Sequence, residues 1–529
     1  MKKLASIQKL ENWIDSYLNF EKTPKKNIFW LDTMRFFCEK FGHPENFAPC
    51  FHVAGSKGKG SVSTFIASIL DEAGFKTGLY TSPHILDFIE RVSSPRGPFE
   101  EEAYDRAVKE IMSGVQAISQ EELPGQRPIT WFELVTLFSF LLFRQAKVDW
   151  SVFEVGLGGR LDSTNVIKPK VSVITPIELE HTEFLGDTLE KIAYEKGGII
   201  KENTPVVIAR QQASVRKVFE KIALEKGAKA IFMEDAVESL DFKIKNISEC
   251  IKNNTFLTNG STDFNNTCIK NHTSLENKGI LPLMSVSFSS KIFSRSVKTT
   301  LQLLGKFQAE NAALAALAVK TALPTISEEI IERGLSKAKL PARFEILRNP
   351  SDSKYDSQNE SSQLQKSLIV LDGAHTVNSV TFTMETMRQV FGERKSEKTA
   401  ATFQEKSKDA FQENSTSEFS ESHAPFNHRI LLFACAADKD AKDIAPLFKN
   451  SFDEIFLTKP GDVKQSDLGK LKSAFDETGI PYDCNEDFEA QIKKAIKKAR
   501  EKEALLLVTG SFYLIAEVKK LMQLYVTFS

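Results

Sequence analysis

The residues best suited to chemistry form a short run of glycine, lysine and serine between two apolar stretches. The run comprises Gly55, Ser56, Lys57, Gly58, Lys59, Gly60 and Ser61, after the apolar segment Phe51–Ala54 and before another at 62–70. Glycines let backbone N–H groups approach an anion closely, a helix N-terminus adds positive partial charge, and Lys59 can reach the outer phosphates of a nucleotide. The run therefore predicts a phosphate-binding loop, although its spacing departs from the common pattern and a flexible surface turn is the alternative.

Two further candidates stand directly after apolar segments. Glu154 follows Trp150–Phe153 and precedes a glycine-rich stretch, where a carboxylate suits a magnesium ion bound to nucleotide phosphates. An ordinary surface acid at a strand end is the alternative. His181 comes just past Val171–Pro176, and its position alone leaves it as an ordinary loop or packing residue.

The remaining candidates allow both a structural and a functional role. On the residues alone, Lys196 is a solvated lysine near a helix end, where the helix dipole favours a cation. Asp372 and His375 follow another apolar segment and could contact a ribose, base or phosphate, but a strand-end turn also uses Asp and Gly. Arg343 could offer a bidentate donor fork to phosphates, or it could be a solvated linker residue.

The elements that must position these residues are short apolar strands that alternate with helices. A first series of strands is expected at Phe51–Ala54, Thr77–Thr81, Trp150–Val155, Val171–Pro176 and Pro205–Ala209. A second series is expected at Ser367–Leu371, Arg429–Ala434, Glu454–Leu457 and Ala504–Thr509. This alternation predicts parallel doubly wound sheets, in which ligands bind at the carboxyl ends of the strands.

Length and composition divide the 529 residues into two domains. We expect an N-terminal phosphate-loop domain of doubly wound α/β fold over residues 1–340 and a smaller Rossmann-like α/β domain over residues 341–529. Polar segments that offer too little burial to offset chain entropy indicate insertions at about 239–291, 349–366 and 393–427.

Charge and hydropathy exclude several classes of function. A net charge of −1 offers no basic surface for nucleic acid or an anionic membrane. The N-terminus is typical of an amphipathic helix rather than a secretion signal, and the most apolar run, 131–143, is too short to cross a bilayer. The six cysteines lack the short paired spacings of zinc or redox sites. We therefore expect a soluble, cytoplasmic monomer with reduced thiols that acts on small molecules.

Taken together, these segments resemble the folylpolyglutamate synthase and dihydrofolate synthase family, within the wider Mur ligase group. The likeness covers most of the chain and rests on the order and approximate spacing of its motifs. These motifs are His52–Ser61, Tyr80–His84, Glu90–Val92, Thr130–Glu133, Glu154–Asn165, His181–Thr182, Glu195–Ile199, Arg343–Glu345, Asp372–His375 and Val508–Ser511.

The resemblance implies an ATP-dependent ligase that adds L-glutamate to a folate or dihydropteroate. A substrate carboxylate attacks the γ-phosphate of ATP, and the amine of glutamate then displaces phosphate from the acyl phosphate. By this resemblance Gly55–Ser61 would hold the phosphates, and two Mg²⁺ ions would serve the reaction. The catalytic residues would be Lys59, His181 and a carbamylated Lys196; the metal ligands would be Ser82, Glu154 and His181, with Ser61 a further candidate. Asn311, Arg343, Asp372 and His375 would contact the nucleotide, in a cleft between the domains.

Some positions depart from the pattern of the family. Phe307 stands where a histidine is usual, and Gly198 follows Gly197 where alanine-glycine is common. Lys57 and Thr376 favour folylpolyglutamate synthases over bifunctional bacterial members. Three alternatives stay open: a Mur-type cell-wall amino acid ligase, which the block Glu154–Arg160 argues against, a phosphotransferase, and a nucleotide-binding protein without turnover.

Overall fold

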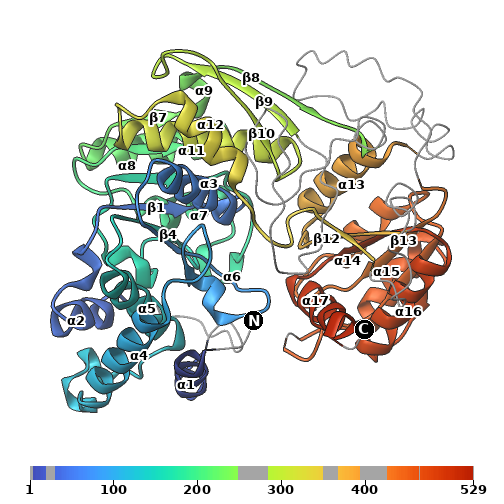
Figure 1. Cartoon of the computed structure of the whole chain (residues 1–529), viewed down its shortest axis with the longest axis horizontal. Helices are drawn as coiled ribbons and strands as arrows, with labels where there is room; N and C mark the ends of the chain where they lie inside the picture. Colours follow the sequence, from blue (N-terminus) through green and yellow to red (C-terminus); the bar gives the residue numbers. More distant parts are fainter. Residues whose placement is uncertain are drawn as a thin grey trace, which may run out of the picture. The chain divides into compact units, whose positions relative to one another are not determined.

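The computed structural model describes residues 4–19, 30–247, 284–349, 367–393, 426–463 and 465–527. The chain forms two compact units, one coloured blue to yellow in Figure 1 and the other mainly orange to red. The first comprises Met1–Phe242, Ser285–Leu301 and Lys306–Leu340, and the second comprises Lys243–Met284, Gln302–Gly305 and Pro341–Ser529. Most of the three predicted insertions, namely 248–283, 350–366 and 394–425, lies outside the described residues, as do Cys250 and Cys268. The four described cysteines are free thiols.

The first unit is built on a seven-stranded sheet with the order β3-β2-β4-β1-β5-β6-β7. Neighbouring strands are parallel except β3, which is antiparallel to β2. The predicted parallel sheet is therefore confirmed, with an antiparallel edge strand that the apolar pattern did not indicate. The strands are β1 (Cys50–Ala54), β2 (Thr77–Tyr80), β3 (Val92–Ser93), β4 (Trp150–Glu154), β5 (Val171–Ile174), β6 (Val206–Ile208) and β7 (Ala230–Phe232).

Helices cover this sheet, and α3, which follows the glycine-rich loop, packs against α11 and α12. The helices are α1 (Ala5–Ile14), α2 (Asp32–Lys40), α3 (Lys59–Glu72), α4 (Glu101–Gln116), α5 (Trp131–Ala146), α6 (Thr182–Leu185), α7 (Leu189–Gly197), α8 (Ala213–Glu225), α9 (Met233–Ala236), α11 (Lys306–Ala322) and α12 (Glu328–Lys337). Short 3-10 helices lie at Pro44–Asn46, Phe88–Arg91, Gln120–Glu122, Pro124–Gln126 and Ser163–Val166. A separate three-stranded sheet comprises β8 (Val237–Ile244), β9 (Met284–Ser290) and β10 (Val297–Leu301).

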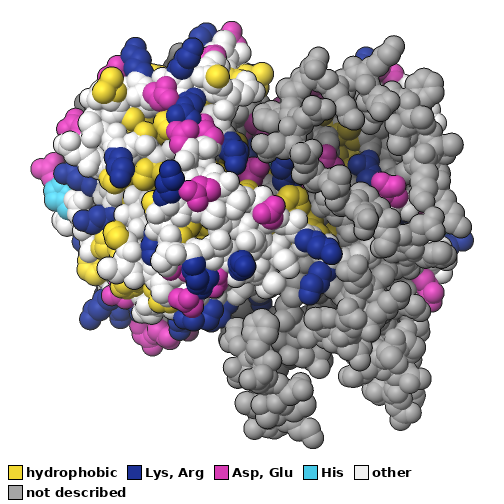
Figure 2. Space-filling model, turned by 90° about the horizontal axis from the view of Figure 1, so that it is seen from above, with side chains coloured by type: hydrophobic (Ala, Val, Ile, Leu, Met, Phe, Trp, Pro, Cys, Tyr) yellow, Lys and Arg dark blue, Asp and Glu magenta, His cyan; other side chains and the backbone are white. Residues whose placement is uncertain are grey.

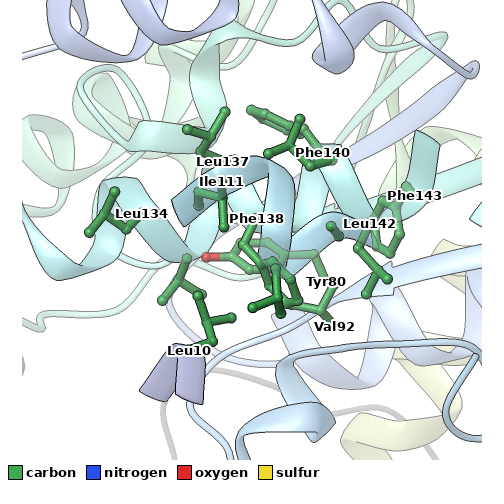
Figure 3. Packing of buried hydrophobic residues seen from close by; sticks show 14 of the residues in the cluster. Leu10, Tyr80, Val92, Ile111, Leu134, Leu137, Phe138, Phe140, Leu142 and Phe143 are labelled. Atoms are coloured by element: carbon green, nitrogen blue, oxygen red, sulfur yellow. The ribbon is translucent and has the colours of Figure 1, made fainter. Parts of the chain in front are cut away.

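The most apolar run of the sequence, 131–143, forms a buried helix, α5. A capping box fixes its start, because Thr130 Oγ1 accepts from Glu133 N at 3.2 Å and Glu133 Oε2 accepts from Thr130 N at 2.8 Å. Its leucine and phenylalanine side chains then pack with residues of α1, α4 and β2 in one apolar cluster (Figure 3). A helix that is apolar on nearly all sides is stable only when surrounded by protein in this way. Within the described part of the chain, no helix is long and apolar enough to cross a membrane.

The second unit contains a six-stranded sheet with the order β11-β12-β16-β13-β14-β15. It is parallel except for β11, which is antiparallel to β12 and was not expected from the sequence. The strands are β11 (Glu345–Arg348), β12 (Leu368–Asp372), β13 (Arg429–Phe433), β14 (Glu454–Leu457), β15 (Asp483–Cys484) and β16 (Leu505–Thr509). The helices are α13 (Val377–Phe391), α14 (Ala441–Ile444), a 3-10 turn at Ala445–Phe448, α15 (Leu468–Thr478), α16 (Phe488–Glu501) and α17 (Phe512–Thr527).

Charged side chains of both signs are interspersed on the part of the surface that Figure 2 shows in colour. This mixture agrees with the near balance between Lys plus Arg and Asp plus Glu in the whole sequence. We therefore expect the functional site at the carboxyl ends of the strands rather than at a surface patch of one charge.

Candidate functional site

The order of the first sheet brings the carboxyl ends of four parallel strands together at one edge. The strands β2, β4, β1 and β5 are successive neighbours. Ser82 follows β2, Glu154 ends β4, Gly55 follows β1, and the segment Thr175–His181 follows β5. Residues that are far apart in the sequence therefore lie on one edge, as expected for a ligand site in an α/β sheet.

The glycine-rich loop depends on glycine at two positions with positive φ. Gly55 has a φ of +142°, and a methyl group there would lie 1.9 Å from Thr175 Oγ1. Gly58 has a φ of +86°, and a methyl group there would lie 2.6 Å from Asn311 Oδ1. Asn311 lies on α11 and is buried, and its Nδ2 donates to Gln308 Oε1 at 3.2 Å. The predicted residue Asn311 thus contacts the predicted loop directly, on the side of Gly58.

The two halves of the loop make different contacts. Ser56 N and Lys57 N donate to Pro176 O at 2.9 and 3.4 Å, so these two N–H groups bond to protein. Helix α3 opens with the bond from Val62 N to Gly58 O at 2.9 Å, which leaves the N–H groups of its first turn without an intrahelical acceptor. Lys59 Nζ donates to Gly55 O at 3.0 Å and to Ser56 O at 3.4 Å. The second half of the loop is therefore the part that can bind an anion.

Glu154 is a buried carboxylate beside this anion-binding end. Its Oε2 accepts from Ser82 N at 3.0 Å, and the residue is 4% exposed. A methyl group on Gly60 would lie 3.6 Å from both carboxylate oxygens. The structure thus places two predicted metal-site residues, Ser82 and Glu154, in contact with each other and next to the first turn of α3.

Lys196 is buried, so the prediction from residues alone that it is solvated is wrong. It is 1% exposed, and its Nζ donates to Gly55 O at 2.8 Å and to Glu180 Oε1 at 2.9 Å. Burial lowers the pKa of the Lys196 ammonium, although Glu180 opposes that shift. Burial acts to raise the pKa of Glu180, but the neighbouring lysines, Lys196 foremost, outweigh it and lower that pKa. Glu180 was missed from the sequence, although it stands directly before the candidate His181.

His181 occupies the start of α6 in a left-handed conformation, with a φ of 47°. Its backbone oxygen accepts from Phe184 N at 2.9 Å and from Leu185 N at 3.0 Å, and its side chain is exposed. Among the described residues no three His, Cys, Asp or Glu side chains gather as a metal-binding group. The predicted metal ligands include two serines beside Glu154 and His181, and that set stays a prediction.

A buried network of polar side chains supports the segment after β4, and sequence reasoning missed it. Asp162 Oδ2 accepts from Gly156 N and Leu157 N, both at 3.0 Å, and Asp162 Oδ1 accepts from Thr164 Oγ1 at 2.5 Å. Thr164 Oγ1 is in turn 2.9 Å from His52 Nε2 on β1. Burial raises the pKa of Asp162 and holds that of His52 well below its usual value. This network of hydrogen bonds thus links β1 to the turn that follows Glu154.

The second unit gathers three predicted residues around an aromatic ring. Arg343 lies over the Phe512 ring, with Cζ 4.3 Å from its centroid, and the His375 ring meets the same ring edge-on at 5.9 Å. Asp372 Oδ2 accepts from Phe344 N at 3.0 Å, and its Oδ1 accepts from Ala374 N at 2.9 Å. Burial raises the pKa of Asp372 to about 6, against the charge of Arg343. Phe512 was missed, although it stands just past the motif Val508–Ser511.

Known proteins resemble this chain over nearly its whole length. The Mur ligase middle domain matches residues 53–319. The dihydrofolate synthase/folylpolyglutamate synthase of Bacillus subtilis (strain 168) is 30% identical over 525 residues, which cover 98% of this chain and 99% of that protein. The structure of Mycobacterium tuberculosis folylpolyglutamate synthase complexed with ADP and AMPPCP has a TM-score of 0.71 at 22% identity, and covers 98% of both chains. The Escherichia coli FolC structure in complex with DHPP and ADP has a TM-score of 0.68 at 23% identity, and covers 100% of both. The likeness to these two structures confirms the predicted α/β fold.

Proposed function

The chain belongs to the dihydrofolate synthase/folylpolyglutamate synthase family and is an ATP-dependent ligase that adds glutamate to a folate; on this premise we propose which of its residues do so, and how. The main reaction in this proposal is folylpolyglutamate synthesis, with dihydropteroate as a second acceptor. The relative from Bacillus subtilis, whose printed name includes both activities, supports testing the two acceptors side by side.

One observation carries the assignment of the reacting site. The first turn of α3, which begins at Lys59, lies beside the Glu154 carboxylate, since a methyl group added to Gly60 would be in van der Waals contact with both carboxylate oxygens. N–H groups and a lysine attract phosphates, whereas a carboxylate repels them unless a cation lies between. This pairing is typical of a site for a nucleotide and a divalent cation, and it supports ATP as the phosphate donor.

The proposed reaction needs activation because a carboxylate is a poor electrophile. An oxygen of the folate carboxylate attacks the γ-phosphorus of ATP, an O–P bond forms, and the bond to the β,γ-bridging oxygen breaks to release ADP. The amine of glutamate then attacks the acyl carbon, loses a proton, and displaces inorganic phosphate. Lys59 moves from its two neutral carbonyl acceptors to the charged phosphate, where a charge-assisted hydrogen bond is stronger.

The residues at this edge fit magnesium in their donor chemistry. Glu154 supplies a buried carboxylate and Ser61 a buried hydroxyl, and oxygen donors are those that Mg²⁺ prefers. We assign Ser61, Ser82, Glu154 and His181 as the ligand candidates for two magnesium ions. When bound, the metal would neutralise charge that spreads over the transferring phosphoryl group.

Lys196 suits carbamylation, because carbon dioxide adds only to a neutral amine and burial lowers the pKa of this group. The modification converts the cation beside Gly55 and Glu180 into an anion that can hold a metal. Asn311 in the first unit, and Arg343, Asp372 and His375 in the second, stay the predicted nucleotide contacts.

The test is phosphate release by purified protein with ATP, Mg²⁺ and glutamate, comparing tetrahydrofolate with dihydropteroate. We expect release that requires both glutamate and an acceptor. Lys59→Ala should abolish it with either acceptor, whereas the matched control Lys109→Ala, on the exposed side of α4, should keep it. Equal activity in the two variants would remove Lys59 from the mechanism.

Isotope transfer separates ligation from the alternatives. With ¹⁸O in the acceptor carboxylate, the acyl phosphate route moves one labelled oxygen into inorganic phosphate. A phosphotransferase would instead accumulate a stable phosphorylated acceptor without glutamate. A protein without turnover would bind ATP and release no phosphate with any folate.

A further inference from the structure

The turn after β5 contains a break in the sheet that a side chain bridges. The parallel strands β5 and β6 pair through Ile174 and Ile208, and Ala209 N donates to Ile174 O at 2.8 Å. In a parallel ladder the next donor on β5 would be residue 176. That residue is Pro176, which has no N–H group, so the ladder ends there.

The side-chain amide of Gln211 binds the peptide groups on both sides of this proline. Gln211 Nε2 donates to Thr175 O at 3.2 Å, and Ile177 N donates to Gln211 Oε1 at 3.1 Å. Ile177 is 6% exposed, so its N–H group has little access to water. An amide is suited to this task because it carries one donor group and one acceptor group on a planar end.

The turn held by Gln211 is the surface on which the first half of the phosphate loop rests. Pro176 O accepts from both Ser56 N and Lys57 N, and Glu178 O accepts from Ser56 Oγ at 3.1 Å. Thr175 also contacts Gly55 so closely that no methyl group fits between them. A shift of this turn therefore moves the loop.

We propose that Gln211 is a positioning residue for nucleotide binding, acting through the turn Thr175–Glu178 on the loop Gly55–Ser61. This inference rests on the proposed function, because it assigns ATP to that loop. Loss of the amide leaves Thr175 O and Ile177 N without these partners, and the turn must rearrange to satisfy them. The second half of the loop then no longer presents its N–H groups and Lys59 at the geometry that phosphates require.

The neighbouring glutamine supplies a matched control. Gln212 is exposed, and its side chain makes no capping bond at the start of α8. The full-length variants Gln211→Met and Gln212→Met thus change the same side chain in the same way at adjacent positions. The measurements are the KM for ATP, the KM for tetrahydrofolate, kcat and the dissociation constant of ADP.

We expect Gln211→Met to raise the KM for ATP and the dissociation constant of ADP by about tenfold. The KM for tetrahydrofolate should stay within about twofold of its wild-type value. This comparison matters because a purely structural defect would change the KM values for both substrates, or would lower only the stability of the protein. Gln211→Glu keeps the acceptor for Ile177 N and places a carboxylate oxygen against Thr175 O, so it should show the same selective loss. It is measured in place of Gln211→Met if that variant does not fold.

Two results would overturn the inference: equal ATP parameters in the position 211 and position 212 variants, or a parallel rise in both KM values. The proposed function would be refuted instead if the wild-type protein released no phosphate in an ATP-dependent reaction. The two failures are therefore distinguishable.

Discussion

Replacing Thr164 by valine is expected to destabilise the first unit, because the hydroxyl of Thr164 joins two buried polar side chains. Thr164 Oγ1 donates to Asp162 Oδ1, so its contact with His52 Nε2 requires the histidine to be the donor. Burial, followed by the charge of Lys201, keeps the pKa of His52 well below its usual value, so its ring is neutral. The remaining nitrogen, Nδ1, carries no proton in that tautomer.

The size of the loss follows from the two bonds. A hydrogen bond to a charged group contributes about 1.5–3 kcal/mol, and a buried donor left unsatisfied costs about 1–3 kcal/mol. Valine has nearly the shape of threonine, so no cavity term is added. Thr164→Val should therefore lower the free energy of unfolding by about 3–5 kcal/mol. Thr164→Ser keeps both bonds and should lose about 1 kcal/mol with its methyl group.

Tryptophan fluorescence during urea unfolding reports the loss of stability in the first compact unit, which contains Thr164. All four tryptophans, Trp13, Trp30, Trp131 and Trp150, belong to the first unit. The reasoning is refuted if the valine and serine variants unfold at the same urea concentration. A further check is His52→Leu combined with Thr164→Val, which removes donor and acceptor together and should be more stable than Thr164→Val alone.

Two other predictions address the loop and the second unit. Gly55→Ala should weaken ATP binding in calorimetry, because it adds backbone strain of about 1–3 kcal/mol and a clash with Thr175. Gly74→Ala, at a φ of +91° with open space around it, shares the strain without the clash and should bind ATP normally; equal binding by both variants would contradict the argument. The pKa of Asp372 is raised to about 6 from 3.8, so the folded state holds the proton more tightly and its stability falls as pH rises from about 4 through 6. The expected fall in stability is about 3 kcal/mol. Urea unfolding followed by circular dichroism across this pH range should show a smaller fall in Asp372→Asn than in the wild type. An equal dependence of stability on pH in the two proteins would contradict a raised pKa of Asp372.

The features that sequence reasoning predicted are those encoded by adjacent residues. The strand Phe51–Ala54, its glycine-rich loop and the following helix are continuous, so their pattern was sufficient to identify β1 and α3. The edge strand β11 was missed because it lies between a turn and a polar segment and has little apolar length of its own. Its place in the sheet depends on pairing with β12, a long-range contact that no local pattern contains.

Lys196 shows why the candidate site was only partly predictable. A lysine in the last turn of a helix satisfies every local rule for a solvated residue. Its burial depends on Gly55 O, which is 141 positions away in the sequence, and on Glu180 beyond the start of its helix. A buried ammonium is tolerated only with such partners, and partners at that separation become known from the fold.

The seven residues of the predicted phosphate loop look alike in the sequence, but the structure divides them into two parts. Ser56 and Lys57 bond through their backbone to Pro176, whereas Lys59, Gly60 and Ser61 open α3. Binding an anion with helix-end N–H groups requires that the helix start be held still, since each group loses attraction as it turns away. The first half of the loop meets this requirement, because its backbone hydrogen bonds to Pro176 hold it against the end of the neighbouring strand β5. We therefore expect that the residues that tune nucleotide affinity in this chain include some that make no contact with a phosphate.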